Sequence, residues 1–158
     1  MRQLILAALC AATSTATLAA DPQVPYPEGY RDWHHVKSMV IEEGHPLYGS
    51  FGGIHHLYAN DKAMKGYQKG TFPDGSVIIF DLLEAVHEGN AVTEGDRKVV
   101  GVMHKDSKSY RDTGGWGFEG FGGGDPTNRV VGGNAASACF ACHAPQKAQD
   151  YTFSKLRD

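Results

Sequence analysis

The sequence predicts an α+β domain that is mainly β-sheet with a few short helices, and three observations support this prediction. Ser76–Glu84 is rich in β-branched residues, lies between turn signals and is apolar on both of its faces. Helical signals are fewer, and the clearest of them lies at 61–69. Strand-like composition or alternation recurs in four other runs, at 36–42, 51–58, 97–105 and 116–121.

The first elements alternate extended segments with short helical ones. Asp21–Tyr26 and the proline that follows contain three prolines in seven residues, so this stretch is expected to be extended. Glu28–Trp33 is expected to form a helical turn. Strands are expected at Val36–Glu42 and Phe51–Tyr58, with a loop at 45–49 between them.

A short helix is predicted next. Asn60 is a favourable N-cap residue, Asp61–Lys69 follows it, and Gly70 is suited to end the helix. The inner face of this helix is expected to consist of Ala63, Met64 and Tyr67.

The second half of the chain contains the strongest strand. Pro73-Asp74-Gly75 marks a turn, and the period of two in Ser76–Glu84 gives one face to Val77, Ile79 and Leu83 and the other to Ile78, Phe80 and Leu82. A strand that is apolar on both faces is expected at the centre of a sheet. The remaining elements are expected to be a polar hairpin connection at 89–96, a strand at 97–105, a helical turn at 107–112, a strand at 116–121, a glycine-rich loop at 122–134 and a C-terminal helix at 135–149.

The N-terminus has the pattern of a secretory signal. Arg2 precedes an apolar run at 4–12, and small residues follow before Ala19 and Ala20. Cleavage is expected after Ala19, with Ala20 as the alternative, which leaves a single domain at 20–158 in the periplasm. The apolar run is too short to span a bilayer, so no membrane anchor is expected.

The charge balance excludes some classes of partner. Removal of residues 1–19 takes away only Arg2 from the 15 basic residues and none of the 18 acidic ones, which leaves a formal charge of −4. This acidic balance gives no support for binding to nucleic acid or to an anionic membrane.

The chemistry-bearing motif is Cys139-Phe140-Ala141-Cys142-His143. The sequence has one other cysteine, Cys10, and it lies within the signal segment. The motif therefore contains every cysteine of the chain that remains after cleavage. Two thiols can form thioethers to a haem while the next imidazole reaches the iron, so the motif predicts one covalent haem c per chain with His143 as the iron ligand. The alternative is a disulfide or redox pair. Zinc is not expected, because the motif lacks the four ligands of a structural site.

The residues alone leave the second axial ligand of the iron open. A methionine ligand would favour electron transfer, whereas an empty position would favour ligand binding. The candidate ligands are His34, His35, His45, His55, His56, His87, His104, Met39, Met64 and Met103.

Four stretches together carry a family resemblance: "FGGIHHLYAND", "FPDGSVIIFDLLEA", "KDSKSYRDTGGWGFEGF" and "CFACHAPQKAQDYTFSKL". From about Tyr30 onward the chain resembles the cytochrome P-460 family, and within it the cytochrome c′-beta branch. The resemblance implies a mainly antiparallel sheet with a few helices, usually as a homodimer. It also implies a haem held by Cys139 and Cys142, with His143 as proximal ligand and an empty distal position.

One position departs from the hydroxylamine-oxidising members of that family. Those members carry a lysine that becomes cross-linked to the haem, and the matching residue here is Phe80. Phenylalanine has no amine, so the cross-link cannot form there. In the cytochrome c′-beta branch two phenylalanines cap the distal face, and the resemblance assigns this role to Phe51 and Phe80.

These expectations give a leading function and two alternatives. The leading one is a periplasmic, five-coordinate haem c protein that binds nitric oxide or carbon monoxide beneath the phenylalanine cap, for nitric oxide scavenging or sensing. The first alternative is an electron-transfer cytochrome c that meets a redox partner protein. The second is an oxidoreductase acting on hydroxylamine or nitric oxide, against which the missing lysine argues.

Overall fold

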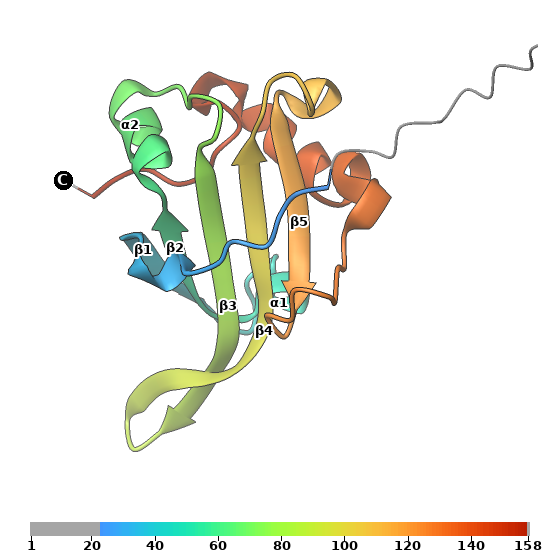
Figure 1. The fold of residues 1–158 in the computed structure, drawn as a ribbon. Helices are drawn as coiled ribbons and strands as arrows, with labels where there is room; N and C mark the ends of the chain where they lie inside the picture. Colours follow the sequence, from blue (N-terminus) through green and yellow to red (C-terminus); the bar gives the residue numbers. More distant parts are fainter. Residues whose placement is uncertain (1–22, 158) are drawn as a thin grey trace, which may run out of the picture.

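A computed structural model describes residues 23–157, so the predicted signal segment at 1–19 lies outside the described residues. Five antiparallel strands form one sheet in the order β1-β2-β3-β4-β5, with short helices around it (Figure 1). The predicted α+β class and the central place of the strongest strand are therefore confirmed. The strands are β1 (His34–Ile41), β2 (Gly53–Ala59), β3 (Val77–Glu88), β4 (Ala91–Lys105) and β5 (Trp116–Gly122).

The helical elements of the described part are short. None of them is long and apolar enough to cross a membrane. They are η1 (Tyr30–Asp32), α1 (Tyr48–Phe51), α2 (Asp61–Lys69), η2 (Arg111–Thr113), η3 (Gly132–Asn134), η4 (Ala136–Phe140), α3 (Ala141–His143) and η5 (Ala144–Gln149).

Helix α2 has the boundaries that its capping residues predict. The Asn60 side chain accepts a hydrogen bond from Ala63 N at 2.9 Å, and Gly70 ends the helix in the left-handed conformation with φ of 76°. Asn60 Oδ1 also accepts from Val77 N at 3.1 Å, and Asn60 Nδ2 donates to the Gly75 carbonyl at 3.0 Å. One side chain thus joins the start of α2 to the start of β3.

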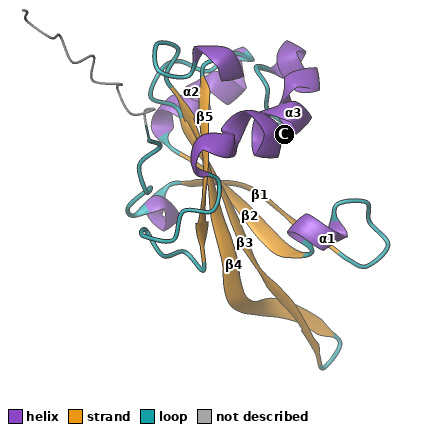
Figure 2. Ribbon diagram, turned by 90° about the vertical axis from the view of Figure 1, so that its right-hand side faces the viewer, coloured by secondary structure: helices purple, strands orange, loops and turns teal. Residues whose placement is uncertain are grey.

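The two faces of β3 pack against different layers. Ile79 lies in a cluster on the face that the N-terminal segment crosses in Figure 1, together with Val24, Tyr30, Val100, Val102 and Phe121. Ile78 lies on the opposite face, in a cluster with Val36, Ala59, Ala63, Phe72, Trp116 and Phe118. Figure 2 shows that α1 and the C-terminal helical segment are both on this second side of the sheet.

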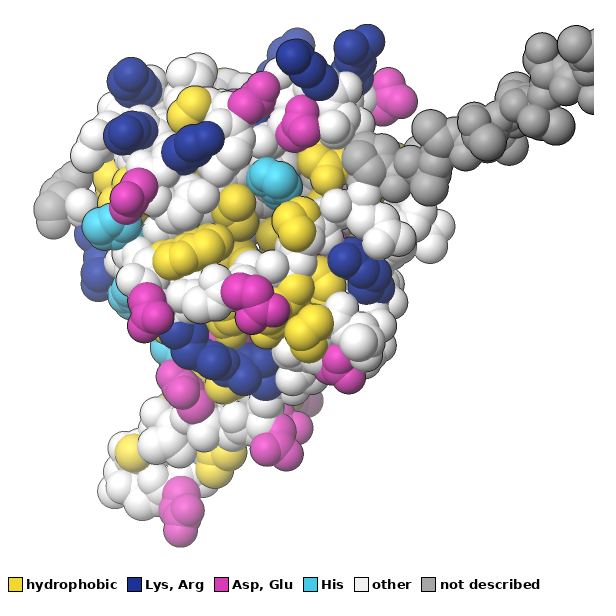
Figure 3. All heavy atoms as spheres, in the orientation of Figure 1, with side chains coloured by type: hydrophobic (Ala, Val, Ile, Leu, Met, Phe, Trp, Pro, Cys, Tyr) yellow, Lys and Arg dark blue, Asp and Glu magenta, His cyan; other side chains and the backbone are white. Residues whose placement is uncertain are grey.

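The β3–β4 hairpin is longer than the sequence predicts. The expected polar connection at 89–96 is wrong, because β4 begins at Ala91 and pairs back to Glu88. Gly89 and Asn90 form the turn with φ of 58° and 62°, the backbone of a tight two-residue hairpin turn. The hairpin projects beyond the sheet in Figures 1 and 2, and in Figure 3 acidic side chains lie along it.

Two other local predictions need correction. Phe51 ends helix α1 and does not begin a strand. The strand β2 begins only at Gly53, which has φ of 132° and where a Cβ would collide with the Leu83 carbonyl. The single helix expected at 135–149 is divided into π-helical, α-helical and 3-10 turns, and Gln146 leaves the helical conformation.

Candidate functional site

The C-terminal helical segment places its two thiols differently. Cys139 is half-buried and packs against the cluster that contains Ile78 and Phe118, whereas Cys142 is exposed. Both are free thiols in the structure. Cys139, in the π-helical turn at 136–140, therefore packs towards the sheet, whereas Cys142, in α3, is at the surface.

The environment of Cys139 does not fit a redox pair. Burial raises the pKa of its thiol to about 11, and the charges of Glu119 and Cys142 add to the rise. Reactive cysteines depend instead on a lowered pKa, because the thiolate is the nucleophile. The thiol is thus held protonated in an apolar setting, which disfavours the redox interpretation of the motif.

His143 presents one ring nitrogen for a ligand. Its Nδ1–H donates to the Tyr151 carbonyl at 2.7 Å, which leaves Nε2 as the nitrogen with a lone pair. The ring lies between Phe118 and Phe153, with centroids 5.0 and 4.9 Å away. Burial lowers the pKa of His143, against the effect of the Tyr151 hydrogen bond, and a neutral imidazole is the form that binds a metal.

Phe51 and Phe80 meet in the structure, although they come from α1 and β3. Their rings are edge to face, with centroids 5.5 Å apart and planes at 77°. Phe80 is half-buried, and Phe51 is 40% exposed at the end of α1. The structure thus brings together the two residues to which the family resemblance assigns one cap.

A strip without side chains runs across the sheet beside Phe80. Phe80 pairs with Gly101, and Gly101 pairs in turn with Gly120. A Cβ at Gly101 would lie 3.4 Å from Phe80 Cβ, and one at Gly120 would lie 2.7 Å from Val130 Cγ2. Gly101 therefore leaves the sheet surface beside Phe80 without a side chain of its own, and the Val130 side chain covers the adjacent Gly120.

These features fit a large, flat, apolar group tethered through the thiols. Three apolar side chains at the edges of this region are unusually exposed, namely Phe51 (40%), Val130 (57%) and Phe153 (59%). Each touches part of the site: Phe51 touches Phe80, Val130 overlies Gly120, and Phe153 touches His143. A haem attached at Cys139 and Cys142 would cover such side chains, and the residues present therefore fit that group.

His55 is a further residue of this region, and the sequence did not single it out from the ten candidate ligands. Its ring stacks on Phe80 with centroids 4.4 Å apart and planes at 33°, and it is 5% exposed. Burial, followed by the charge of His56, lowers the pKa of His55 to about 4. Its Nδ1 has no hydrogen-bond partner among the residues described. The sequence could not identify His55, because the pairing of β2 with β3 determines which face of the sheet its side chain occupies.

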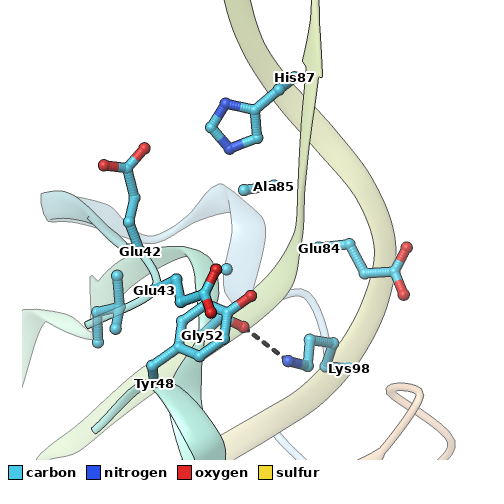
Figure 4. A pocket seen from close by; sticks show the side chains of 10 residues that line it. Glu42, Glu43, Tyr48, Gly52, Glu84, Ala85, His87 and Lys98 are labelled. Atoms are coloured by element: carbon cyan, nitrogen blue, oxygen red, sulfur yellow. Dashed lines mark hydrogen bonds between the residues drawn. The ribbon is translucent and has the colours of Figure 1, made fainter. Parts of the chain in front are cut away.

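A separate hollow of about 480 Å³ lies near α1 and the base of the β3–β4 hairpin (Figure 4). Its lining is polar, with the carboxylates of Glu42, Glu43 and Glu84 around it and Lys98 bonded to the Gly52 carbonyl. None of the five predicted site residues lines it. The hollow is therefore distinct from the region around His143.

The chain was also compared with known proteins. The sequence profile of the family described as Cytochrome P460 matches residues 27–154. This match includes all five strands and the cysteine motif. No curated protein matches the chain.

Proposed function

The chain belongs to the cytochrome P460 family, whose members bind haem c, and from this premise we propose that it is a gas-binding cytochrome. In this proposal Cys139 and Cys142 tether one haem and His143 is the proximal ligand. The distal position stays open to nitric oxide or carbon monoxide, and the biological role is nitric oxide scavenging or sensing. The edge-to-face contact of Phe51 with Phe80 is the observation that carries the proposal.

The two phenylalanines would select ligands by keeping polar groups and bulky substrates away from the distal side of the haem. The bound haem supplies an iron that can coordinate a diatomic gas. Phe51 and Phe80 offer no proton donor, and general acid–base work needs a polar group within hydrogen-bond reach of the substrate. A cap of this kind leaves little room for bulky substrates and gives bound oxygen no hydrogen bond. Nitric oxide and carbon monoxide lose little in an apolar pocket, because both are small and almost neutral.

Residue 80 also bears on the enzymatic alternative. A phenylalanine stands where the resemblance places the cross-linking lysine of hydroxylamine-oxidising members. The lysines at 62, 65 and 69 belong to α2, and Lys62 Nζ donates to the Asp74 carbonyl at 3.3 Å. We therefore rank hydroxylamine oxidation below gas binding.

One observation favours electron transfer as the second candidate. His55 is buried and neutral, and it stacks directly on Phe80. His55 thus places an imidazole in direct contact with a residue that is assigned to the cap. A second imidazole ligand would make the iron six-coordinate and favour electron transfer over gas binding.

Cellular location and assembly complete the proposal. The signal pattern at 1–19 supports export to the periplasm, and the resemblance supports a homodimer of the 20–158 domain. Size-exclusion chromatography with light scattering tests the dimer. Mass spectrometry of the exported protein tests both the cleavage site after Ala19 and the mass of one attached haem.

An absorption spectrum of the exported holoprotein decides between the two main candidates. Gas binding predicts a high-spin, five-coordinate ferrous spectrum that shifts on addition of carbon monoxide and of nitric oxide. A low-spin spectrum that ignores carbon monoxide would overturn it and support the electron carrier. Turnover of hydroxylamine with an electron acceptor would instead revive the enzymatic alternative.

A further inference from the structure

The chain after the cysteine motif contains two consecutive left-handed residues that are not glycine. Asp150 has φ of 50° and ψ of 43°, and Tyr151 has φ of 65°. Such conformations are unfavourable for residues that carry a side chain and persist only where the surrounding structure fixes them. Tyr151 is also the residue whose carbonyl accepts the His143 hydrogen bond.

The Asp150 side chain is bound from two directions. Its carboxylate accepts from Phe72 N at 2.7 Å and from Lys105 Nζ at 2.7 Å. Its carbonyl accepts from Trp116 Nε1 at 2.9 Å. Donors from the loop before β3, from β4 and from β5 thus hold this one residue.

Lys105 is itself fixed. The residue is 8% exposed, and its Nζ donates to the Gly114 carbonyl at 3.1 Å and lies 5.0 Å from the centre of the Trp116 ring. The ion pair with Asp150 is almost fully buried, with exposed fractions of 10% and 13% for the two side chains. Removal of one partner from such a pair leaves an uncompensated buried charge, so separation of the two side chains is strongly unfavourable.

Tyr151 is held in the same way. Its N–H donates to the Gln146 carbonyl at 2.9 Å. Its ring lies against Gly114, where φ is 66° and a side chain would collide with the ring. The direction of the Tyr151 carbonyl is therefore set by its neighbours on both sides.

We propose that Asp150 is the positioning residue of the proximal histidine. The clamp of Asp150 by Lys105 and Phe72 N maintains the left-handed turn, and the turn aims the Tyr151 carbonyl at His143 Nδ1–H. A ligating histidine becomes more basic when its other nitrogen donates to a fixed acceptor. The inference rests on the proposed role of His143 as iron ligand and adds the residue that tunes it.

Two substitutions in the holoprotein test the clamp. Asp150→Gly keeps the left-handed conformation available but removes the carboxylate, and Asp150→Asn keeps one acceptor but removes the charge. Both are expected to lower the iron–histidine stretching frequency in the ferrous resonance Raman spectrum and to raise the haem reduction potential. The shift should be larger for Asp150→Gly. Thioether attachment, measured by haem that stays with the denatured chain, should be retained.

A double variant protects the test against misfolding. Asp150→Asn with Lys105→Met removes both charges of the buried pair, so neither is left unpaired. It should show the Raman shift expected for Asp150→Asn, and it takes the place of that variant if the single substitution impairs folding. Asp125→Asn alters a loop aspartate that binds Thr127, and as the matched control it should leave the frequency unchanged.

The outcomes separate the two hypotheses. An unchanged frequency and potential in all the Asp150 variants would overturn the positioning role while His143 remains the ligand. The absence of any iron–histidine band from the wild-type spectrum, together with the same absence in the control, would instead overturn the assignment of His143.

Discussion

The rings of Phe51 and Phe80 meet edge to face with their centroids 5.5 Å apart, which brings the end of a four-residue helix onto the central strand of the sheet. Helix α1 has no buried residue of its own. The contact is therefore a main support for the place of α1 over the sheet, together with the hydrogen bond of Lys98 Nζ to the Gly52 carbonyl at 2.6 Å.

Truncation of the cap should accelerate gas binding. Phe80→Ala or Phe51→Ala opens the region above the glycine strip, and we expect the carbon monoxide association rate to rise about tenfold, equivalent to about 1.4 kcal/mol of barrier. Flash photolysis measures the rate. Phe121→Leu, on the opposite face of the sheet, is the control and should change stability alone. Equal rates in both truncations and the wild type would show that the pair does not cap the site.

The glycine strip should be needed for haem. Gly101→Val places a β-branched side chain where the sheet surface is bare, and valine suits a strand, so the sheet itself should tolerate it. We expect the ratio of haem to protein, from the pyridine haemochrome spectrum, to fall strongly. Gly49→Ala has open space around its Cβ and should leave the ratio unchanged. Full haem content in Gly101→Val would mean that the group lies elsewhere.

Stability should decrease in mild acid because of His55. Its folded pKa is about 4, whereas a histidine in an unfolded chain titrates near 6.5. Between pH 4 and 6.5 the unfolded state therefore binds more protons than the folded state. The contribution of His55 to the free energy of unfolding is fully present above pH 6.5 and declines as the pH falls towards 4. The loss has an upper limit of about 3 kcal/mol, from 1.36 kcal/mol per pKa unit.

Urea unfolding across this pH range measures the effect. His55→Leu should flatten the profile in part, because burial also lowers the pKa of His104, which contributes in the same direction. A profile identical to that of the wild type would show that His55 titrates normally in the folded chain.

Asn60 should contribute more to the free energy of unfolding than a simple helix cap does. Asn60→Ala removes the bond from Ala63 N and also those to Val77 N and the Gly75 carbonyl. We expect a loss of about 2–3 kcal/mol, above the usual ~1 kcal/mol for a cap. Asn60→Asp retains the acceptor and should recover most of the loss in thermal or urea unfolding. A cost below 1 kcal/mol would show that the link to β3 contributes little.

Local chemistry made α2 and β3 predictable from the sequence. Asn60 and Gly70 fix the ends of α2 by their own side-chain and backbone properties. The central place of β3 follows from its two apolar faces. The hairpin was harder, because its exposed residues after Glu84 carry no apolar alternation and are held by backbone pairing.

In the site, too, some residues could be predicted from local sequence and others depend on the tertiary structure. The motif marks Cys139, Cys142 and His143 directly, since they are adjacent in sequence. His55 and Asp150 could not be found in this way, because their roles depend on strand register and on a turn that three distant donors hold. Phe51 was assigned from the resemblance, and only its contact with Phe80 places it beside the glycine strip.

The strand order has a consequence for how the chain folds. Each strand pairs with the strand next to it in sequence, so the sheet can assemble hairpin by hairpin, a topology that favours rapid folding. The thiols and His143 come after the last strand. The sheet face that carries Phe80 can thus form before the residues that attach the haem are in place.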